Sequence, residues 1–105
     1  MSLDIEVRKA RDEAFVLDLS GKLTREQVGR LQEVVACIPL PAIIVLNLEG
    51  VTKLDSAGLG EIIWLHKHYH VRIINLTGRP KQMFEITRMS SQLKIMGSEE
   101  EALAA

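Results

Sequence analysis

The sequence predicts an α/β fold: a single domain in which a mixed central β-sheet of about four or five strands carries about four helices. Apolar runs typical of strands alternate along the chain with segments of helical periodicity. At 105 residues the chain is long enough to bury one hydrophobic core but not two, so we expect one domain over residues 1–105. Strands followed repeatedly by helices imply right-handed crossovers, which place functional groups at the carboxyl ends of the strands.

Two strand patterns open the chain. Ile5 and Val7 alternate with charged neighbours, and residues 15–19 place three apolar side chains on one face of a second strand. The polar segment 9–13 between them is predicted to be a turn, so the two strands form an antiparallel hairpin. Gly21 is expected to end the second strand.

The first helix is predicted from about Thr24 to Cys37. Thr24 with Gln27 three residues later has the form of a capping box, and apolar residues follow at helical spacing. Pro39 and Pro41 stop this helix and keep the connection to the next strand short.

The centre of the fold is predicted to lie in residues 43–48, a near-continuous apolar run of the kind found in strands covered on both faces. A helix begins just after Asp55 and Ser56, whose side-chain oxygens can accept its first unpaired N–H groups, and continues to about His68. Ser56 is therefore expected on the surface at a helix N-terminus, where the helix dipole favours an anion and a phosphate group is tolerated.

The last third of the chain continues the alternation. Residues 71–76 are predicted to form a strand parallel to the central one, and the segment 78–80, with its proline, starts another helix. A short strand is expected at 93–96, followed by a terminal helix with Ser98 and Glu101 as a capping box. The apolar side of the helix after residue 78 is expected to comprise Met83, Phe84, Ile86 and Met89.

Composition excludes several classes of partner. Thirteen basic and fourteen acidic residues leave a net charge of −1 with no basic cluster, so nucleic acid and anionic membrane are not expected partners. No apolar run approaches the roughly 20 residues that span a bilayer, and the N-terminus lacks the pattern of a signal peptide. We expect a cytoplasmic protein, which agrees with the single Cys37 having no partner for an internal disulfide.

Catalytic and metal-binding interpretations are weaker than a binding role. His66 and His70 share a helical face if the helix reaches that far, but no cysteine or suitably placed glutamate completes a zinc site. Ser56 has no histidine placed by sequence to act as its base. Gly58 and Gly60 lack the lysine of a phosphate-binding loop, and more simply allow another backbone or a partner surface to come close. We therefore expect no metal, no cofactor and no enzymatic activity.

Trp64, the only tryptophan, lies beside the apolar stripe of the Ser56 helix rather than within it. It is either a core residue or a surface anchor, because tryptophan is enriched both in cores and at interface hot spots. Gly58, Glu61 and Leu65 share its approximate side of the helix. If that side is open, it is the natural docking face.

The segment LNLEGVTKLDSAGLGEII, residues 46–63, resembles the signature of the STAS domain, the fold of anti-sigma factor antagonists. That signature is an apolar strand, a short turn and then Asp-Ser-(Ser/Thr)-Gly-Leu-Gly at the start of a helix. Residues 21–24 are similar to the family's turn into its first helix, and the end of the chain resembles its last strand and helix, so the resemblance covers nearly the whole chain. It implies a STAS-like domain in which Ser56, directly after Asp55, is the phosphoacceptor.

The resemblance also implies partner switching. The unphosphorylated protein would bind an anti-sigma factor that is also a serine kinase; that kinase would phosphorylate Ser56 and be released, and a serine phosphatase would reset the cycle. The residues expected to bind the partner lie around Ser56 and on its helix: Thr24, Asp55, Ser56, Ala57, Gly58, Leu59, Gly60, Glu61 and Trp64.

The sequence departs from the family pattern at three positions. Ala57 stands where antagonists usually have serine or threonine, Thr24 where many have aspartate, and Arg88 where the family often has glycine. The alternative interpretation is a STAS module that is never phosphorylated and docks on a transporter ATPase or within a signalling assembly. In that case Ser56 is simply a helix cap.

Overall fold

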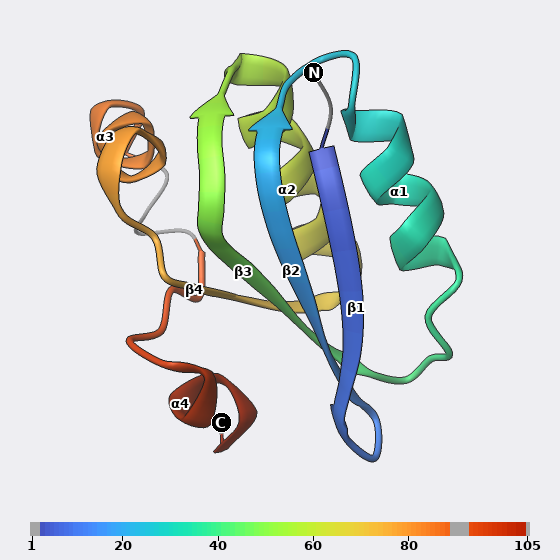
Figure 1. Cartoon of the computed structure of the whole chain (residues 1–105). Helices are drawn as coiled ribbons and strands as arrows, with labels where there is room; N and C mark the ends of the chain where they lie inside the picture. Colours follow the sequence, from blue (N-terminus) through green and yellow to red (C-terminus); the bar gives the residue numbers. More distant parts are fainter. Residues whose placement is uncertain (1–2, 89–92, 105) are drawn as a thin grey trace.

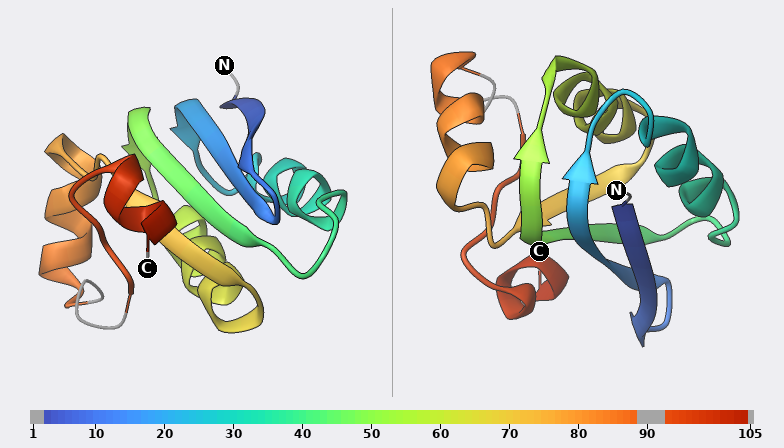
Figure 2. Two further views of the ribbon diagram at one scale, coloured as in Figure 1. Left: turned by 90° about the horizontal axis from the view of Figure 1, so that it is seen from below. Right: turned by 45° about the horizontal axis from the view of Figure 1, so that its top comes forward.

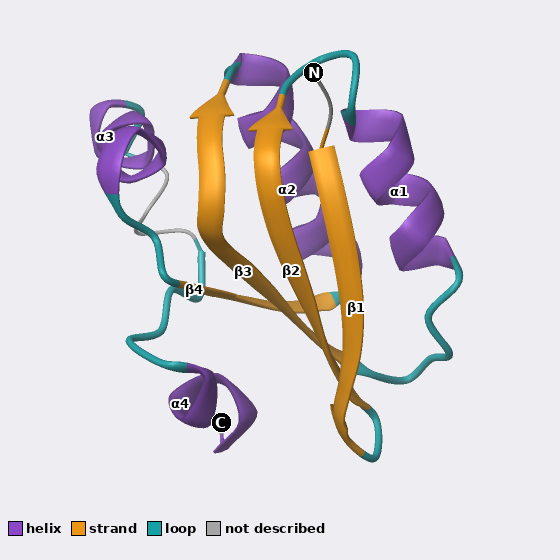
Figure 3. Cartoon of the chain, viewed as in Figure 1, coloured by secondary structure: helices purple, strands orange, loops and turns teal. Residues whose placement is uncertain are grey.

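The computed structural model describes residues 3–88 and 93–104, which form a four-stranded β-sheet with helices packed around it (Figures 1 and 3). The sequence predicts a single mixed α/β domain with about four or five strands and about four helices; this is confirmed, with four strands. In chain order the elements are β1 (Leu3–Arg11), β2 (Ala14–Leu23), α1 (Val28–Ala36), β3 (Ile43–Leu54), α2 (Ser56–His68), β4 (His70–Ile74), α3 (Gly78–Ile86) and α4 (Glu99–Ala104).

The strands lie in the order β1-β2-β3-β4. β1 and β2 form the predicted antiparallel hairpin, whereas β2 pairs with β3 and β3 with β4 in parallel. The apolar run 43–48 thus lies in an interior strand, as predicted. β2 does not end at Gly21, because parallel pairing continues past a register shift to Leu23, opposite Leu54. The two central strands therefore reach further toward Ser56 than their apolar runs indicate.

Helices cover the two faces of the sheet unequally (Figure 2). α1 and α2 lie on one face and enclose the main core, in which Leu31, Ile44 and Ile62 are fully buried. α4 lies on the other face, where Ala102 packs against Val16, Val45 and Ile74. That second face is only partly covered. α4 packs against β3 and β4 and is bonded by Arg8 and Arg11 of β1, while most side chains of β1 stay exposed.

The first helix begins later than predicted. α1 starts at Val28, after a turn in which the Gln27 N–H bonds the Thr24 carbonyl at 2.8 Å. The side chain of Gln27 accepts from the backbone N–H of Leu3 at 3.4 Å, and no side-chain cap closes the helix. The capping box predicted for Thr24 is therefore wrong, because its glutamine is used to fix the start of β1.

The C-terminal elements agree better with the sequence. Ser98 Oγ accepts the Glu101 N–H at 3.2 Å at the start of α4, so this capping role is confirmed. Residues near 95 contribute an isolated parallel bridge to β4, opposite Ile73, rather than a full strand. Of the apolar side predicted for α3, Phe84 is fully buried, but Ile86 is 81% exposed, so its assignment is wrong. Met89 lies outside the described residues.

Candidate functional site

Ser56 is the exposed first residue of α2, two residues after Leu54, the buried last residue of β3. This is the carboxyl end of a parallel strand, where functional groups gather in α/β sheets. The residue before it, Asp55, has an extended backbone and supplies the N-cap of the helix. The Ser56 side chain is thus placed at the positive end of the helix without having to act as the cap.

Asp55 ties together two parts of the chain that are far apart in sequence. Its Oδ1 accepts the Gly58 N–H at 2.8 Å, and its Oδ2 accepts the Arg25 N–H at 3.0 Å. Burial by itself raises the pKa of Asp55, but the hydrogen bonds from Gly58, Arg25 and the Ala57 N–H outweigh burial and hold the pKa below its ordinary value. The residue directly before Ser56 therefore carries a charged carboxylate at neutral pH.

Gly58 lets α2 pack directly against the end of β2. A Cβ atom at this position would lie 2.2 Å from the carbonyl oxygen of Leu23 and 2.9 Å from Cδ1 of Leu54. Real Cβ atoms do not approach other atoms so closely, so only glycine fits. The predicted close approach at Gly58 is thus a contact with the protein's own backbone. Leu59 beside it is buried, so both residues fix the position of Ser56.

A line of exposed residues four apart runs down α2 from Ser56: Ser56, Gly60, Trp64 and His68, here called the exposed α2 face. Trp64 is 44% exposed, and its ring stacks on His68 with 4.1 Å between the centroids. A Cβ atom added at Gly60 would meet nothing within 4 Å, so the helix backbone is accessible there. The exposed α2 face therefore combines an open stretch of backbone with an aromatic anchor.

Trp64 was expected on the same side of α2 as Gly58, Glu61 and Leu65, and this expectation is wrong. Gly58, Glu61 and Leu65 are buried, whereas Trp64 is 44% exposed. Glu61 is only 6% exposed, and its Oε1 accepts from Nε2 of Gln32 in α1 at 2.7 Å. Oε2 has no hydrogen-bond partner among the described residues, and burial raises the pKa of this carboxyl. Glu61 thus links α1 to α2 inside the fold.

Two further predicted site residues border Ser56. Ala57 is half-buried in the first turn of α2, and Thr24 is half-buried in the turn that Asp55 anchors through Arg25. The Thr24 hydroxyl lies 3.4 Å from the carboxylate of Glu26. The structure therefore brings together the turn after β2 and the start of α2, a proximity that sequence spacing does not reveal.

The two histidines considered as zinc ligands do not form a shared site. α2 ends at His68, so His66 and His70 lie on different elements and share no helical face. Within residues 3–88 and 93–104, no three His, Cys, Asp or Glu side chains are grouped to hold a metal ion. Nor does this part of the chain contain a helix long and apolar enough to cross a membrane.

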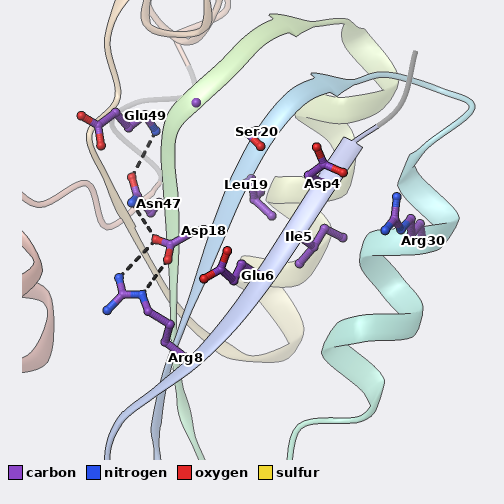
Figure 4. A pocket seen from close by; sticks show the side chains of 11 residues that line it. Asp4, Ile5, Glu6, Arg8, Asp18, Leu19, Ser20, Arg30, Asn47 and Glu49 are labelled. Atoms are coloured by element: carbon purple, nitrogen blue, oxygen red, sulfur yellow. Dashed lines mark hydrogen bonds and ion pairs between the residues drawn. The ribbon is translucent and has the colours of Figure 1, made fainter.

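A hollow lies elsewhere, on the open face of the sheet (Figure 4). Its volume is about 810 Å³, and neither Asp55 nor Ser56 lines it. Its polar groups bond one another: Arg8 donates to Asp18 at 2.6 Å, and Asn47 Nδ2 donates to the same carboxylate at 2.8 Å. These bonds among Arg8, Asp18 and Asn47 stabilise the exposed face, and the carboxylates of Asp4 and Glu6 also line the hollow.

Comparison with known proteins gives consistent results. The family model of the STAS domain matches residues 4–102. Among solved structures, an anti-sigma factor antagonist from Mycobacterium paratuberculosis is similar with a TM-score of 0.79 and 18% identity, over 98% of this chain and 92% of that one. The Bacillus cell fate determinant SpoIIAA in its phosphorylated form gives 0.69 and 19%, over 96% and 97%.

A sulfate transporter family protein from Wolinella succinogenes is also similar, with a TM-score of 0.73 and 14% identity over 92% of this chain and 87% of that one. Among curated protein sequences, none matches significantly. At these identities the structural likeness concerns the fold.

Proposed function

Because the chain belongs to the STAS domain family, we propose that it is a non-catalytic switch protein whose binding to a protein partner is controlled by phosphorylation of Ser56. The observation that carries this proposal is the exposure of Ser56 at the head of α2, beside a cap supplied by Asp55. A kinase can reach the hydroxyl, and modifying it removes no cap from the helix.

The electrostatics of the site support a switch. A phosphate adds a charge of about −1.5 to −2 at neutral pH. In the free protein the N–H groups and dipole of α2 accommodate this charge. In a packed interface the phosphate and the Asp55 carboxylate would have to lose water together and would repel each other. Each 1.4 kcal/mol of that penalty weakens binding about tenfold.

The exposed α2 face is the proposed docking surface. Trp64 offers a large apolar side chain of the type that dominates interface energetics, and Gly60 leaves room for a partner to approach the helix backbone. Of the other residues expected to bind the partner, Gly58, Leu59 and Glu61 would act by positioning the helix, since they are buried. Thr24, Asp55 and Ala57 would form the rim around Ser56.

The proposed partners are a serine kinase that also serves as an anti-sigma factor, and a serine phosphatase that removes the phosphate, all in the cytoplasm. Support comes from the Asp-Ser-Ala-Gly-Leu-Gly element, whose serine matches the phosphoacceptor of the signature that it resembles, and from the fold likeness to anti-sigma factor antagonists. The likeness to a sulfate transporter family protein favours the second candidate, a docking module that is never phosphorylated.

Mass spectrometry of the protein recovered from its native cells under several growth conditions tests the first step. A condition-dependent phosphate on Ser56 supports the switch, and its persistent absence from a protein found in a complex supports the docking module. Binding of the co-purified partner is then measured for Ser56→Ala and Ser56→Asp. We expect Ser56→Ala to bind like the unmodified protein and Ser56→Asp to bind at least about tenfold more weakly.

A matched control is Thr77→Asp, which places the same charge at the exposed start of α3, away from α2. Trp64→Ala tests the surface itself and should weaken binding while leaving the fold intact, because Trp64 is 44% exposed and stands outside the buried core. Equal affinities for Ser56→Ala, Ser56→Asp and Thr77→Asp would rule out the electrostatic switch.

A further inference from the structure

β1 is the outermost strand of the sheet, so one row of its backbone N–H and C=O groups faces away from β2. The direction of this row follows from Leu3. Its N–H donates to Oε1 of Gln27, the residue just before α1, at 3.4 Å. Its carbonyl oxygen accepts from Nη1 of Arg30, which lies in α1. Because the direction alternates along a strand, Ile5, Val7 and Lys9 also turn their backbone groups outward.

The unpaired part of this edge has two defined ends. At one end the groups of Leu3 are satisfied by Gln27 and Arg30, and at the other the pairing with β2 shifts register between Lys9 and Arg11. The free edge therefore comprises residues 5–9, with Val7 at its centre. Among the described residues no strand pairs with it, because β1 ends the sheet.

The side chains of the free edge differ on its two sides. Toward α1, Val7 is 45% exposed and borders an apolar groove of about 330 Å³, which is also lined by Phe15, Glu33, Val34, Cys37, Ile38 and Pro39. On the opposite side of the strand stand Glu6 and Arg8, one acidic and one basic, at the border of the open sheet face (Figure 4).

We propose that two copies of this chain associate through antiparallel pairing of their free edges, with Val7 opposite Val7 of the second copy. This is the one antiparallel register that pairs residues 5–9 completely with themselves, so that every outward N–H and C=O of the free edge gains a partner. The two sheets then continue into one another, and the exposed part of Val7 is buried beside both apolar grooves.

The charges favour the same register. With Val7 opposite Val7, Glu6 of each copy lies opposite Arg8 of the other, at positions where cross-strand side chains come closest. A shift of two residues in one direction would oppose Glu6 to Glu6, and a shift in the other direction would oppose Arg8 to Arg8. Arg8 can make this contact because its guanidinium has a further donor. Nε and Nη2 donate to Asp18 and Glu99, whereas Nη1 donates to neither of them.

Association through β1 is separate from the proposed phosphorylation switch. No residue of the exposed α2 face lies on β1, and Ser56 lies outside the free edge. Ser56→Asp should therefore self-associate like the unmodified chain, so failure of one proposal leaves the other standing.

The test is sedimentation equilibrium of the purified chain over a concentration series from micromolar to millimolar, with variants of the free edge. We expect the unmodified chain to follow a monomer–dimer equilibrium. Val7→Pro removes the central outward N–H, a change that an edge strand tolerates, and should remain monomeric. Val7→Thr keeps the N–H and the strand propensity, and should still dimerise.

The register is tested by charge reversal. Glu6→Arg and Arg8→Glu should each raise the dissociation constant of the homodimer by about tenfold or more, since each opposes like charges across the axis. An equimolar mixture of the two variants restores both opposite-charge pairs and should form a heterodimer. Circular dichroism of each variant checks the fold, and Glu6→Arg alone still tests the charge argument if Arg8→Glu is destabilised.

Three outcomes would overturn the inference. A chain that stays monomeric at millimolar concentration has no such interface, and a Val7→Pro variant that dimerises like the unmodified chain uses another surface. A mixture of Glu6→Arg and Arg8→Glu that does not associate better than either variant alone excludes the register centred on Val7.

Discussion

Replacing Gly58 with alanine should destabilise the fold, although alanine is normally the better helix residue. The new Cβ would lie 2.2 Å from the Leu23 carbonyl oxygen and 2.9 Å from Leu54 Cδ1. To restore ordinary contacts, the start of α2 must move away from β2 by roughly 1 Å. The main obstacle is backbone, which cannot rotate aside as a side chain can, so the strain should reach the upper part of the usual range for overpacking.

The magnitude follows from two opposing contributions. Overpacking costs about 3 kcal/mol at the upper end, and alanine regains about 1 kcal/mol of helix propensity over glycine. The net loss of unfolding free energy should be about 2 kcal/mol, or a fall in Tm of roughly 10 °C for a domain of this size.

Gly60→Ala, in the same helix, is the matched control. Its Cβ would meet nothing within 4 Å, so only the propensity gain applies and the stability should rise by up to about 1 kcal/mol. Urea unfolding followed by far-UV circular dichroism measures both variants, with the slope m expected to stay constant. If Gly58→Ala proved as stable as Gly60→Ala, the close packing of α2 on the end of β2 would be refuted.

Three further outcomes are expected. Asp55→Ala should lower the unfolding free energy by about 0.5 to 2 kcal/mol in urea titrations at pH 7, because both carboxylate oxygens hold backbone N–H groups. The stability difference between the two proteins should shrink as the pH falls from about 4 through the lowered pKa of Asp55. In this range the Asp55 carboxylate becomes protonated, and the unmodified protein loses the stability that the charged form supplies. Glu61→Gln should raise stability at pH 7 by an amount of the order of 1 kcal/mol, because burial raises the pKa of Glu61 and its charged form is unfavourable in the fold. That gain should disappear in unfolding curves at acidic pH, where the carboxyl is protonated; a constant difference at all pH values would contradict it. Asp18→Asn should lower the unfolding free energy by no more than about 1 kcal/mol at pH 7, since its ion pair with Arg8 is partly exposed. This loss should become smaller as salt is added, because salt screens the pair; a larger loss that does not depend on salt would contradict the assignment as a surface ion pair.

Local patterns predicted most of the elements correctly. The hairpin, the interior strand, the helix that starts at Ser56 and the cap at Ser98 all depend on neighbouring residues, so their signals lie within a few positions of one another. α2 ends at His68, where it was expected to end. The placement of Ser56 on the surface at the head of that helix was also predictable, because an Asp-Ser pair before an apolar helix is a capping pattern.

Two of the failed predictions share one cause: a distant part of the chain competes for a local group. Gln27 was expected to close a box with Thr24, but it bonds Leu3 at the start of β1. Gly21 was expected to end a strand, but β3 continues to pair beyond it. Trp64 was grouped with Gly58 because their spacing allows it, yet periodicity gives the faces of a helix without saying which face the sheet covers.

The sequence by itself determined the order and type of the elements and the position of Ser56 at a helix N-terminus, because these follow from backbone hydrogen bonding and side-chain periodicity over short stretches. Only the tertiary structure decided that Asp55 also holds Arg25, that Gly58 lies against Leu23, and that β1 ends the sheet with no described strand along residues 5–9. These features join or separate segments that lie tens of residues apart, and their geometry exists only once the sheet and helices have packed together.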